Sequence, residues 1–338
     1  MSTDTVLSEA KLTANDYASN QEVRWCPGCG DYSVLATVKK VMAKVGLDRS
    51  KTVVVSGIGC SSRFPYYVST YGFHSIHGRA PTLATGLKLA RPDLNVWIAT
   101  GDGDALSIGG NHFLHLVRRN VDVKILLFNN RIYGLTKGQY SPTSEQGKKT
   151  KSSPYGAPER PIRPISVALG ADATFAARVL DADIRQMEYV MERAARHVGT
   201  AFVEVYQNCV IFNDGAYRFA DKETRADTTI SLEHGKPLIF GKNRERGIRL
   251  RGLTPEIVNV ADVPQDQLLV HDEKDAALAF MLSRMAQPQM PEPFGVFRDV
   301  QMPTYEQQVH GQIEQVVAKE GEGDLQELLT GTETWTVS

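Results

Sequence analysis

The chain has 338 residues, of which 42% are hydrophobic, 23% charged and 8% aromatic, so it can bury a large core without disulfides. Its 38 Lys and Arg nearly balance its 39 Asp and Glu, and the formal net charge of -1 gives no basis for binding nucleic acid or an anionic membrane. The sequence shows no signal peptide and no apolar run of about 18 residues, so we expect a cytoplasmic globular protein.

Short apolar runs alternate with helical patterns between residues 52 and 207, as in parallel strands that are covered on both faces. The expected strands are residues 52–56, 95–100, 123–129, 175–180 and 201–207. The expected helices are residues 32–45, 81–90, 184–198 and 275–285. The first ends before Gly46, and Asp183 caps the start of the third. This pattern predicts an α/β fold with a doubly wound, mostly parallel sheet.

The chain divides into three expected parts. Residues 1–21 form an N-terminal arm, residues 22–213 form the α/β domain, and residues 214–338 form an irregular C-terminal extension that contacts a partner subunit. Within the domain, residues 131–164 are rich in Gly, Ser, Thr, Lys and Pro. Because loops of this length in a compact domain are commonly functional, we expect an active-site loop there.

A Gly101-Asp102-Gly103-Asp104 motif follows one expected strand, and Asn129-Asn130 ends the next, which places both at the carboxyl edge where open α/β sheets bind ligands. Asp102, the side-chain carbonyl of Asn130 and the backbone carbonyl of Ile132 offer the hard oxygen ligands that suit Mg²⁺ bridging two phosphates. A Gly-Asp-Gly triplet alone also suits an ordinary turn. Its spacing from Asn-Asn, however, resembles the diphosphate-binding signature of thiamine-dependent enzymes.

Four cysteines need an explanation in a compartment that keeps thiols reduced. Cys26 and Cys29 have the spacing of two thiolates facing one metal centre, which could be zinc or an iron–sulfur cluster. A structural zinc staple alone would explain that pair. Cys60 follows the first expected strand and Cys209 the last, so all four thiolates can converge at the sheet edge that carries Asp102.

Six motifs follow one another along the chain. They are Cys26-Pro27-Gly28-Cys29-Gly30, Ile58-Gly59-Cys60-Ser61-Ser62, His77-Gly78-Arg79, Gly101-Asp102-Gly103-Asp104, Asn129-Asn130 and Tyr133-Gly134-Leu135-Thr136-Lys137-Gly138-Gln139. In order and spacing they resemble the β subunit of 2-oxoacid:ferredoxin oxidoreductases, and the resemblance covers residues 22–240. The resemblance implies one [4Fe–4S] cluster on Cys26, Cys29, Cys60 and Cys209. It also implies the diphosphate half of a thiamine diphosphate site, completed by a separate α subunit that supplies much of the substrate and coenzyme A environment.

By the same resemblance, the expected thiamine diphosphate contacts are Ile58, Gly59, Cys60, Ser61, His77, Gly103, Asp104 and Leu135. A structural role at a helix start explains His77 nearly as well, and Asp104 could equally cap the next helix. Lys137 and Arg63 are the candidates for binding a substrate carboxylate, although an exposed lysine is commonly only solvated.

The resemblance implies thiamine-dependent oxidative decarboxylation of a 2-oxoacid with coenzyme A, with electrons passing through the cluster to ferredoxin. Residues 135–139 and 236–242 are most similar to the 2-oxoglutarate branch, so we expect succinyl-CoA and CO₂ as products, with pyruvate or another 2-oxoacid as the alternative substrate. Two other hypotheses stay open. One is a zinc-stapled, non-oxidative thiamine-dependent decarboxylase or carboligase, and the other is a non-catalytic subunit that presents an iron–sulfur cluster.

Overall fold

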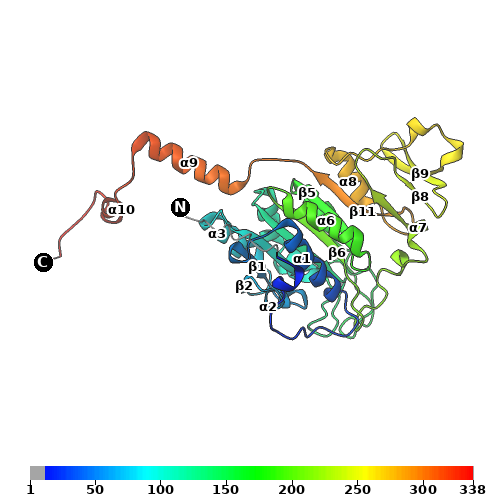
Figure 1. Ribbon diagram of the computed structural model, residues 1–338, viewed down its shortest axis with the longest axis horizontal. Helices are drawn as coiled ribbons and strands as arrows, with labels where there is room; N and C mark the ends of the chain where they lie inside the picture. Colours follow the sequence, from blue (N-terminus) through cyan, green and yellow to red (C-terminus); the bar gives the residue numbers. More distant parts are fainter. Residues whose placement is uncertain (1–11, 338) are drawn as a thin grey trace, which may run out of the picture.

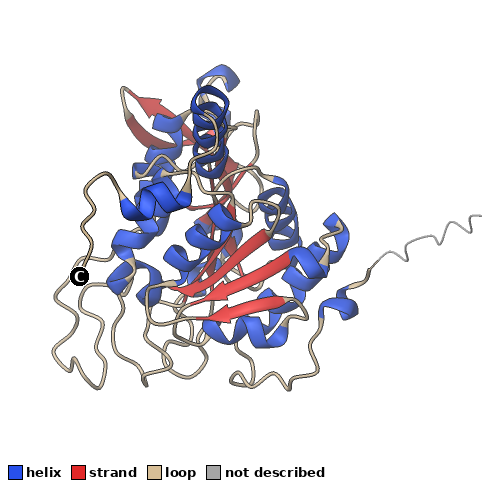
Figure 2. Ribbon diagram, turned by 90° about the vertical axis from the view of Figure 1, so that its left-hand side faces the viewer, coloured by secondary structure: helices blue, strands red, loops and turns tan. Residues whose placement is uncertain are grey.

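The central feature of the fold is an eight-stranded sheet with helices on both faces (Figures 1 and 2). The computed structural model describes residues 12–337, so the first eleven residues of the expected N-terminal arm lie outside the described residues. In the order in which they pair, the strands are β2 (Tyr71–His74), β1 (Thr52–Ser56), β3 (Asn95–Gly101), β4 (Val123–Asn129), β6 (Ala201–Tyr206), β5 (Phe175–Leu180), β11 (Glu292–Asp299) and β7 (Thr229–Leu232). All neighbours are parallel except β5 and β11. The predicted doubly wound α/β fold is confirmed.

Two apolar cores cover the two faces of the sheet. Helices α1 (Asp31–Val45) and α6 (Ile184–Arg196) pack on one face, and α3 (Ala80–Ala90), α4 (Gly110–Arg118), α5 (Pro164–Gly170) and α8 (Ala276–Arg284) pack on the other. Successive strand residues point to opposite faces. Val53 and Val55 therefore join one core while Val54 joins the other. Burial of both faces is why the strands read as continuous apolar runs rather than alternating ones.

Local signals set the ends of the main helices. Gly46 ends α1 in the left-handed region at φ 71°. The Asp183 side chain accepts a hydrogen bond from the Gln186 amide at 3.2 Å and caps α6, and Asp275 caps α8 in the same way. The predicted helices differ from those of the structure by no more than two residues at either end.

The C-terminal part contains more regular structure than the sequence predicts. Strands β7 and β11 pair within the main sheet, and β8 (Ile239–Phe240), β9 (Arg246–Arg251) and β10 (Thr254–Asn259) form a small antiparallel sheet. Helices α9 (Tyr305–Glu320) and α10 (Leu325–Thr330) extend away from the main body, opposite the small sheet (Figure 1). The short helices α2 (Phe64–Tyr67) and α7 (Arg225–Thr228) lie in loops. None of the helices within residues 12–337 has both the length and the apolar character needed to cross a membrane.

A buried ion-pair network joins β11 to the parallel strands. The Arg178 guanidinium contacts Glu204 at 2.8 Å and Glu292 at 2.7 Å. The Tyr206 hydroxyl donates a further hydrogen bond to Glu292 at 2.8 Å, and the Asn129 side chain donates to Glu204 at 2.7 Å. Because both carboxylates are buried, each depends on Arg178 for its counter-charge.

We expect Arg178→Met to lower the free energy of unfolding by roughly 3–5 kcal/mol, because it leaves two buried carboxylates without a cation. Urea denaturation followed by circular dichroism measures the change. Arg91→Met, which removes an exposed ion pair with Asp93, is the matched control and should leave the stability nearly unchanged. An equal decrease in the free energy of unfolding in the two variants would contradict a special role for the buried network.

Candidate functional site

The carboxyl ends of β1, β3 and β4 meet at one pocket, with a volume of ≈ 150 Å³. All of the expected thiamine diphosphate contacts line it, namely Ile58, Gly59, Cys60, Ser61, His77, Gly103, Asp104 and Leu135. The three expected magnesium ligands, Asp102, Asn130 and Ile132, line the same pocket. The structure therefore brings these eleven residues together, although they come from four separate segments of the chain.

The carboxylate of Asp104 joins the turns that form the pocket. It accepts hydrogen bonds from the backbone amides of Ile58 at 3.2 Å and Gly78 at 2.7 Å. The Thr100 hydroxyl donates at 2.7 Å and the His77 Nδ1 lies at 2.6 Å. Since an ionised carboxylate only accepts hydrogen bonds, His77 carries a proton on Nδ1. The side chain of Asp104 thus positions the walls of the pocket rather than capping the next helix.

Asp102 is a buried carboxylate without a counter-charge. It is 3% exposed, accepts hydrogen bonds from the hydroxyls of Ser141 and Thr143, and forms no ion pair with any residue between 12 and 337. Burial raises the pKa of Asp102 above its usual value, while the two hydroxyl donors lower it. A buried carboxylate is stabilised by a cation, so this environment fits a bound Mg²⁺.

Ser141 and Thr143 are site residues that the sequence analysis missed. They lie in the predicted active-site loop, and the Thr143 hydroxyl also lies 2.9 Å from Asn129 Oδ1. The Ser-Pro-Thr-Ser sequence that contains them does not differ from the composition of the surrounding loop. The long distance in sequence between Thr143 and Asp102 left no spacing signal that could have connected them.

The pocket also has the features of a phosphate cradle. The Ser61 Oγ is buried with no hydrogen-bond partner among the described residues, so its hydroxyl is available to donate to a phosphate oxygen. A Cβ on Gly103 would lie 2.1 Å from the Tyr133 ring, whose hydroxyl donates to the Gly103 carbonyl at 3.1 Å. Only glycine therefore fits there, and its backbone stays accessible to a ligand. These features fit a bound diphosphate.

The four cysteines line an adjacent pocket, with a volume of ≈ 220 Å³. The two pockets share Cys60, Asn130, Gly134 and Leu135 as a common wall. A Cβ on Gly134 would lie 3.6 Å from the Cys60 Sγ and 3.7 Å from the Cys209 Sγ. The backbone of the predicted active-site loop therefore runs directly against two of the four sulfurs.

None of the four cysteines forms a disulfide. Burial raises the pKa of the Cys29 and Cys60 thiols, and the negative charge of the neighbouring Asp31 raises both further, while a backbone hydrogen bond from Asp31 lowers that of Cys29. Both thiols are therefore protonated unless a metal replaces the proton. Among the described residues, no three His, Cys, Asp or Glu side chains converge closely enough to hold a single metal ion. The four cysteines instead line one shared pocket.

Both candidate substrate residues, Arg63 and Lys137, lie at the cysteine pocket rather than in the smaller one. Lys137 has a left-handed backbone at φ 74°, in the turn that also carries Leu135. Because Leu135 lines both pockets, Lys137 lies beside the shared wall.

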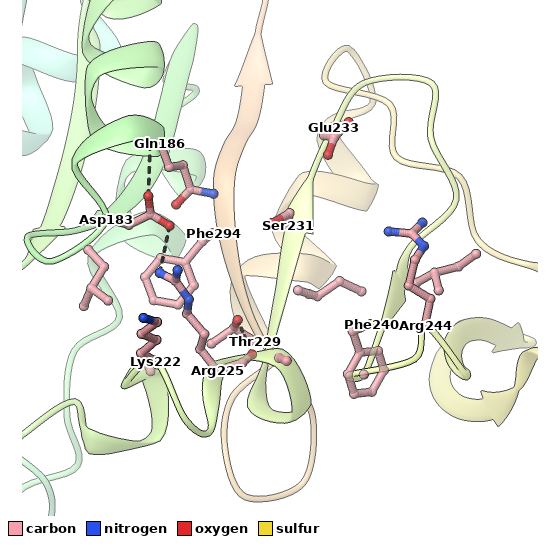
Figure 3. Close-up of a pocket in the computed structure, with 16 residues that line it drawn as sticks. Asp183, Gln186, Lys222, Arg225, Thr229, Ser231, Glu233, Phe240, Arg244 and Phe294 are labelled. Atoms are coloured by element: carbon pink, nitrogen blue, oxygen red, sulfur yellow. Dashed lines mark hydrogen bonds and ion pairs between the residues drawn. The ribbon is translucent and has the colours of Figure 1, made fainter.

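A separate cavity of ≈ 400 Å³ lies between the start of α6, β7 and the small sheet (Figure 3). Its charged groups include Asp183 and Arg225, which pair at 2.9 Å. None of the predicted site residues lines this cavity. Its size alone therefore does not make it the functional site.

Comparisons with known proteins agree with this geometry. Residues 57–205 match a family model described as "Thiamine pyrophosphate enzyme, C-terminal TPP binding domain". The chain is 53% identical over 327 residues to the 2-oxoglutarate oxidoreductase subunit KorB of Mycobacterium tuberculosis, covering 95% of this chain and 88% of that relative. It is 48% identical over 185 residues to the 2-oxoglutarate synthase subunit KorB of Archaeoglobus fulgidus, covering 55% and 69% of the two chains.

A solved structure shows the same fold. It is a 2-oxoglutarate:ferredoxin oxidoreductase from Magnetococcus marinus with 2-oxoglutarate, coenzyme A and succinyl-CoA bound, and its TM-score is 0.77 at 33% sequence identity. The match covers 96% of this chain and 97% of the other. The predicted thiamine-diphosphate-binding fold is thereby confirmed. The chain belongs to the β subunits of the 2-oxoacid:ferredoxin oxidoreductases, in the 2-oxoglutarate branch.

Proposed function

We propose that this chain, with an α subunit, converts 2-oxoglutarate and coenzyme A to succinyl-CoA and CO₂. The two electrons released would pass through one [4Fe–4S] cluster to ferredoxin. The observation that carries the proposal is the common wall between the cysteine pocket and the pocket around Asp102. The relative from M. marinus, whose structure holds 2-oxoglutarate, coenzyme A and succinyl-CoA, supports the choice of substrates.

In the smaller pocket, bound thiamine diphosphate would supply the electron sink that decarboxylation of a 2-oxoacid requires. We assign Asp102, Asn130 and the Ile132 carbonyl as ligands of its Mg²⁺. The Ser61 hydroxyl and the backbone at Ile58, Gly59, Cys60, Gly103 and Leu135 would border the diphosphate. Asp104 holds His77 in one tautomer, so His77 can accept a hydrogen bond at Nε2 while Nδ1 keeps its proton.

At the cysteine pocket we assign Cys26, Cys29, Cys60 and Cys209 as the cluster ligands. A zinc ion would draw its ligands to about 2.3 Å from one point, whereas each thiolate of a four-iron cluster binds a different iron. Four cysteines that line one pocket of ≈ 220 Å³ without converging on a single point fit the second arrangement better. Because the chain has only four cysteines, it supplies ligands for one such cluster. Free thiols also suit a cytoplasmic location, which we propose for the protein.

Arg63 and Lys137 are the residues that we propose bind the carboxylates of the substrate. Both line the cysteine pocket, so a dianionic 2-oxoacid bound by them would lie near the wall that this pocket shares with the cofactor pocket. Arg63 can form a two-pronged contact with a carboxylate, while Lys137 acts as a point charge.

The C-terminal arm, residues 305–337, supports the need for a partner. Ile313 and Val316 on α9 are 53% and 55% exposed, and Leu328 on α10 is 80% exposed. The root of the arm is held to the body, since the His310 ring donates to the Leu89 carbonyl at 3.0 Å. An apolar stripe that starts from an anchored root fits docking on another protein, and we propose the α subunit as that partner.

The proposed reaction is tested with the chain purified anaerobically together with its α subunit. We expect 2-oxoglutarate to reduce a low-potential ferredoxin only when coenzyme A is present, and at least about tenfold faster than pyruvate, a discrimination of about 1.4 kcal/mol. Faster turnover of pyruvate would mean that 2-oxoglutarate is not the main substrate. No reduction by a preparation that contains zinc but no iron would favour the zinc-stapled decarboxylase.

The metal site is tested by Asp102→Ala, which should abolish Mg²⁺-dependent binding of thiamine diphosphate while leaving the visible absorption of the cluster unchanged. Thr143→Val should weaken the metal affinity by roughly 10–100-fold, because it removes a donor that orients Asp102. Isothermal calorimetry on the complex measures both effects. Thr150→Val, in the same loop, is the matched control. Tight cofactor binding by Asp102→Ala would refute the assignment of the metal ligand.

The partner surface is tested by ending the chain after Gly311, which keeps the anchored root of the arm. Removal of the apolar stripe should weaken retention of the α subunit by roughly tenfold or more, as measured by co-purification and size-exclusion chromatography. Replacing Ile313 and Val316 by serine should have the same effect, whereas Gln312→Ser and Gln315→Ser should not. Unchanged retention would contradict α-subunit docking, and a complex reduced to one αβ pair would indicate contact between copies of this chain.

A further inference from the structure

One buried side chain at the cysteine pocket has no role in the assignments above. Gln207 directly follows β6 and is 1% exposed. Its Nε2 lies 3.2 Å from the Cys29 Sγ and 2.7 Å from the Asn208 carbonyl oxygen. An amide nitrogen carries two hydrogens, so it can donate to both atoms at once.

The orientation of the Gln207 amide follows from its surroundings. The oxygen and the nitrogen of a glutamine side chain can be assigned either way round, and the correct assignment is the one that gives each neighbour a suitable hydrogen-bond partner. The Asn208 carbonyl accepts hydrogen bonds and never donates them, so the atom that faces it at 2.7 Å must be Nε2. The same nitrogen faces the Cys29 sulfur. The side-chain N–H of Gln207, and not its side-chain oxygen, therefore faces the Cys29 sulfur.

The neighbouring backbone holds this side chain in place. A Cβ on Gly30 would lie 3.0 Å from the Gln207 Cγ and 1.8 Å from the Asp181 Oδ2. Glycine at position 30 thus lets both side chains approach the cysteine turn. The Asp181 carboxylate in turn accepts a hydrogen bond from the backbone N–H of Asn208 at 2.8 Å. The backbone N–H of Gln207 donates to the backbone carbonyl of Asn129 at 3.0 Å. Both the backbone and the side chain of Gln207 are fixed.

The hydrogen bonds of the buried Gln207 side chain contribute little to the stability of the fold. The Oε1 of Gln207 is buried with no partner among the described residues, and an unsatisfied buried polar group destabilises the fold. A neutral thiol is also only a weak acceptor. A thiolate that binds a cluster is a much better acceptor for the same N–H, because charge strengthens a hydrogen bond. Among residues 12–337, no other side chain donates to any of the four sulfurs.

We propose that Gln207 sets the reduction potential of the cluster through its N–H···S hydrogen bond to Cys29. The inference rests on the proposed assignment of the cluster to the four cysteines. Reduction adds an electron whose charge is shared by the sulfurs, so a donor aimed at one of them stabilises the reduced form more than the oxidised form. Burial strengthens this effect, because little water screens it. Gln207 thus raises the potential at which the cluster accepts an electron.

The test replaces the amide by a side chain of similar length that cannot donate. In the complex with its α subunit, Gln207→Met should shift the electron equilibrium between the cluster and a reference dye toward the oxidised cluster by roughly tenfold, equal to a fall of about 59 mV for one electron. A redox titration followed by electron paramagnetic resonance measures the potential. Gln207→Leu, which also lacks the donor and adds no charge, should lower it by a similar amount.

The matched control is Gln146→Met. Gln146 also donates its side-chain amide to a backbone carbonyl, that of Pro158 at 3.2 Å, but it does not line the cysteine pocket. It should leave the potential unchanged. A potential within error of the wild type in both Gln207 variants would overturn the inference. Loss of the cluster in both would overturn it too, since Gln207 would then hold the site together rather than tune it. A wild-type complex without iron would instead refute the proposed function itself.

Discussion

The four hydrogen bonds accepted by Asp104 are the interaction on which the cofactor pocket depends. They draw together the turn after β1, the turn before α3 and the end of β3. The contact is so close that a Cβ on Gly57 would lie 2.0 Å from the Asp104 Oδ2, which explains why a glycine follows β1. With Asp104 holding these turns, Asp102 lies in the same pocket without a counter-charge. The two carboxylates of one short motif therefore have different roles, which their hydrogen-bond partners decide.

The same sheet edge explains why two kinds of chemistry can lie side by side. Parallel strands end at the same edge of the sheet, so the loops after β1 and β6 can meet there although β3 and β4 lie between these strands. Cys60 and Cys209, about 150 residues apart in the chain, line one pocket, and a Cβ on Gly134 would lie within 3.7 Å of both sulfurs. Cys60 stands at the junction, because it lines both pockets. An electron acceptor held at one pocket would then be separated from a cofactor at the other by a single wall. The proposed pairing of decarboxylation with one-electron transfer would thus rest on the topology of the sheet.

The sequence predicted what depends on local pattern. The five parallel strands are continuous apolar runs, and the motif residues follow their carboxyl ends. The sequence therefore predicts both the carboxyl edge of the sheet and the residues that lie at it. Strand β2 is only four residues long and is exposed along its whole length, and Pro293 and Gly295 interrupt the apolar residues of β11, so neither is a continuous apolar run. Ser141 and Thr143 were missed because their function depends on how a long loop folds back onto Asp102. Gln207 was missed because it belongs to no motif, and only the fold places it against Cys29.

The central claim, a four-iron cluster held beside a thiamine diphosphate site, is tested most directly by the metal content of the complex purified without oxygen. Iron, acid-labile sulfide and zinc are measured together, per copy of this chain. We expect four irons and four sulfides per copy of this chain, in excess of any that the α subunit binds on its own. All of them should be lost in Cys29→Ala and in Cys209→Ala. Stoichiometric zinc with no iron or sulfide would contradict it and would make the cysteines a structural staple.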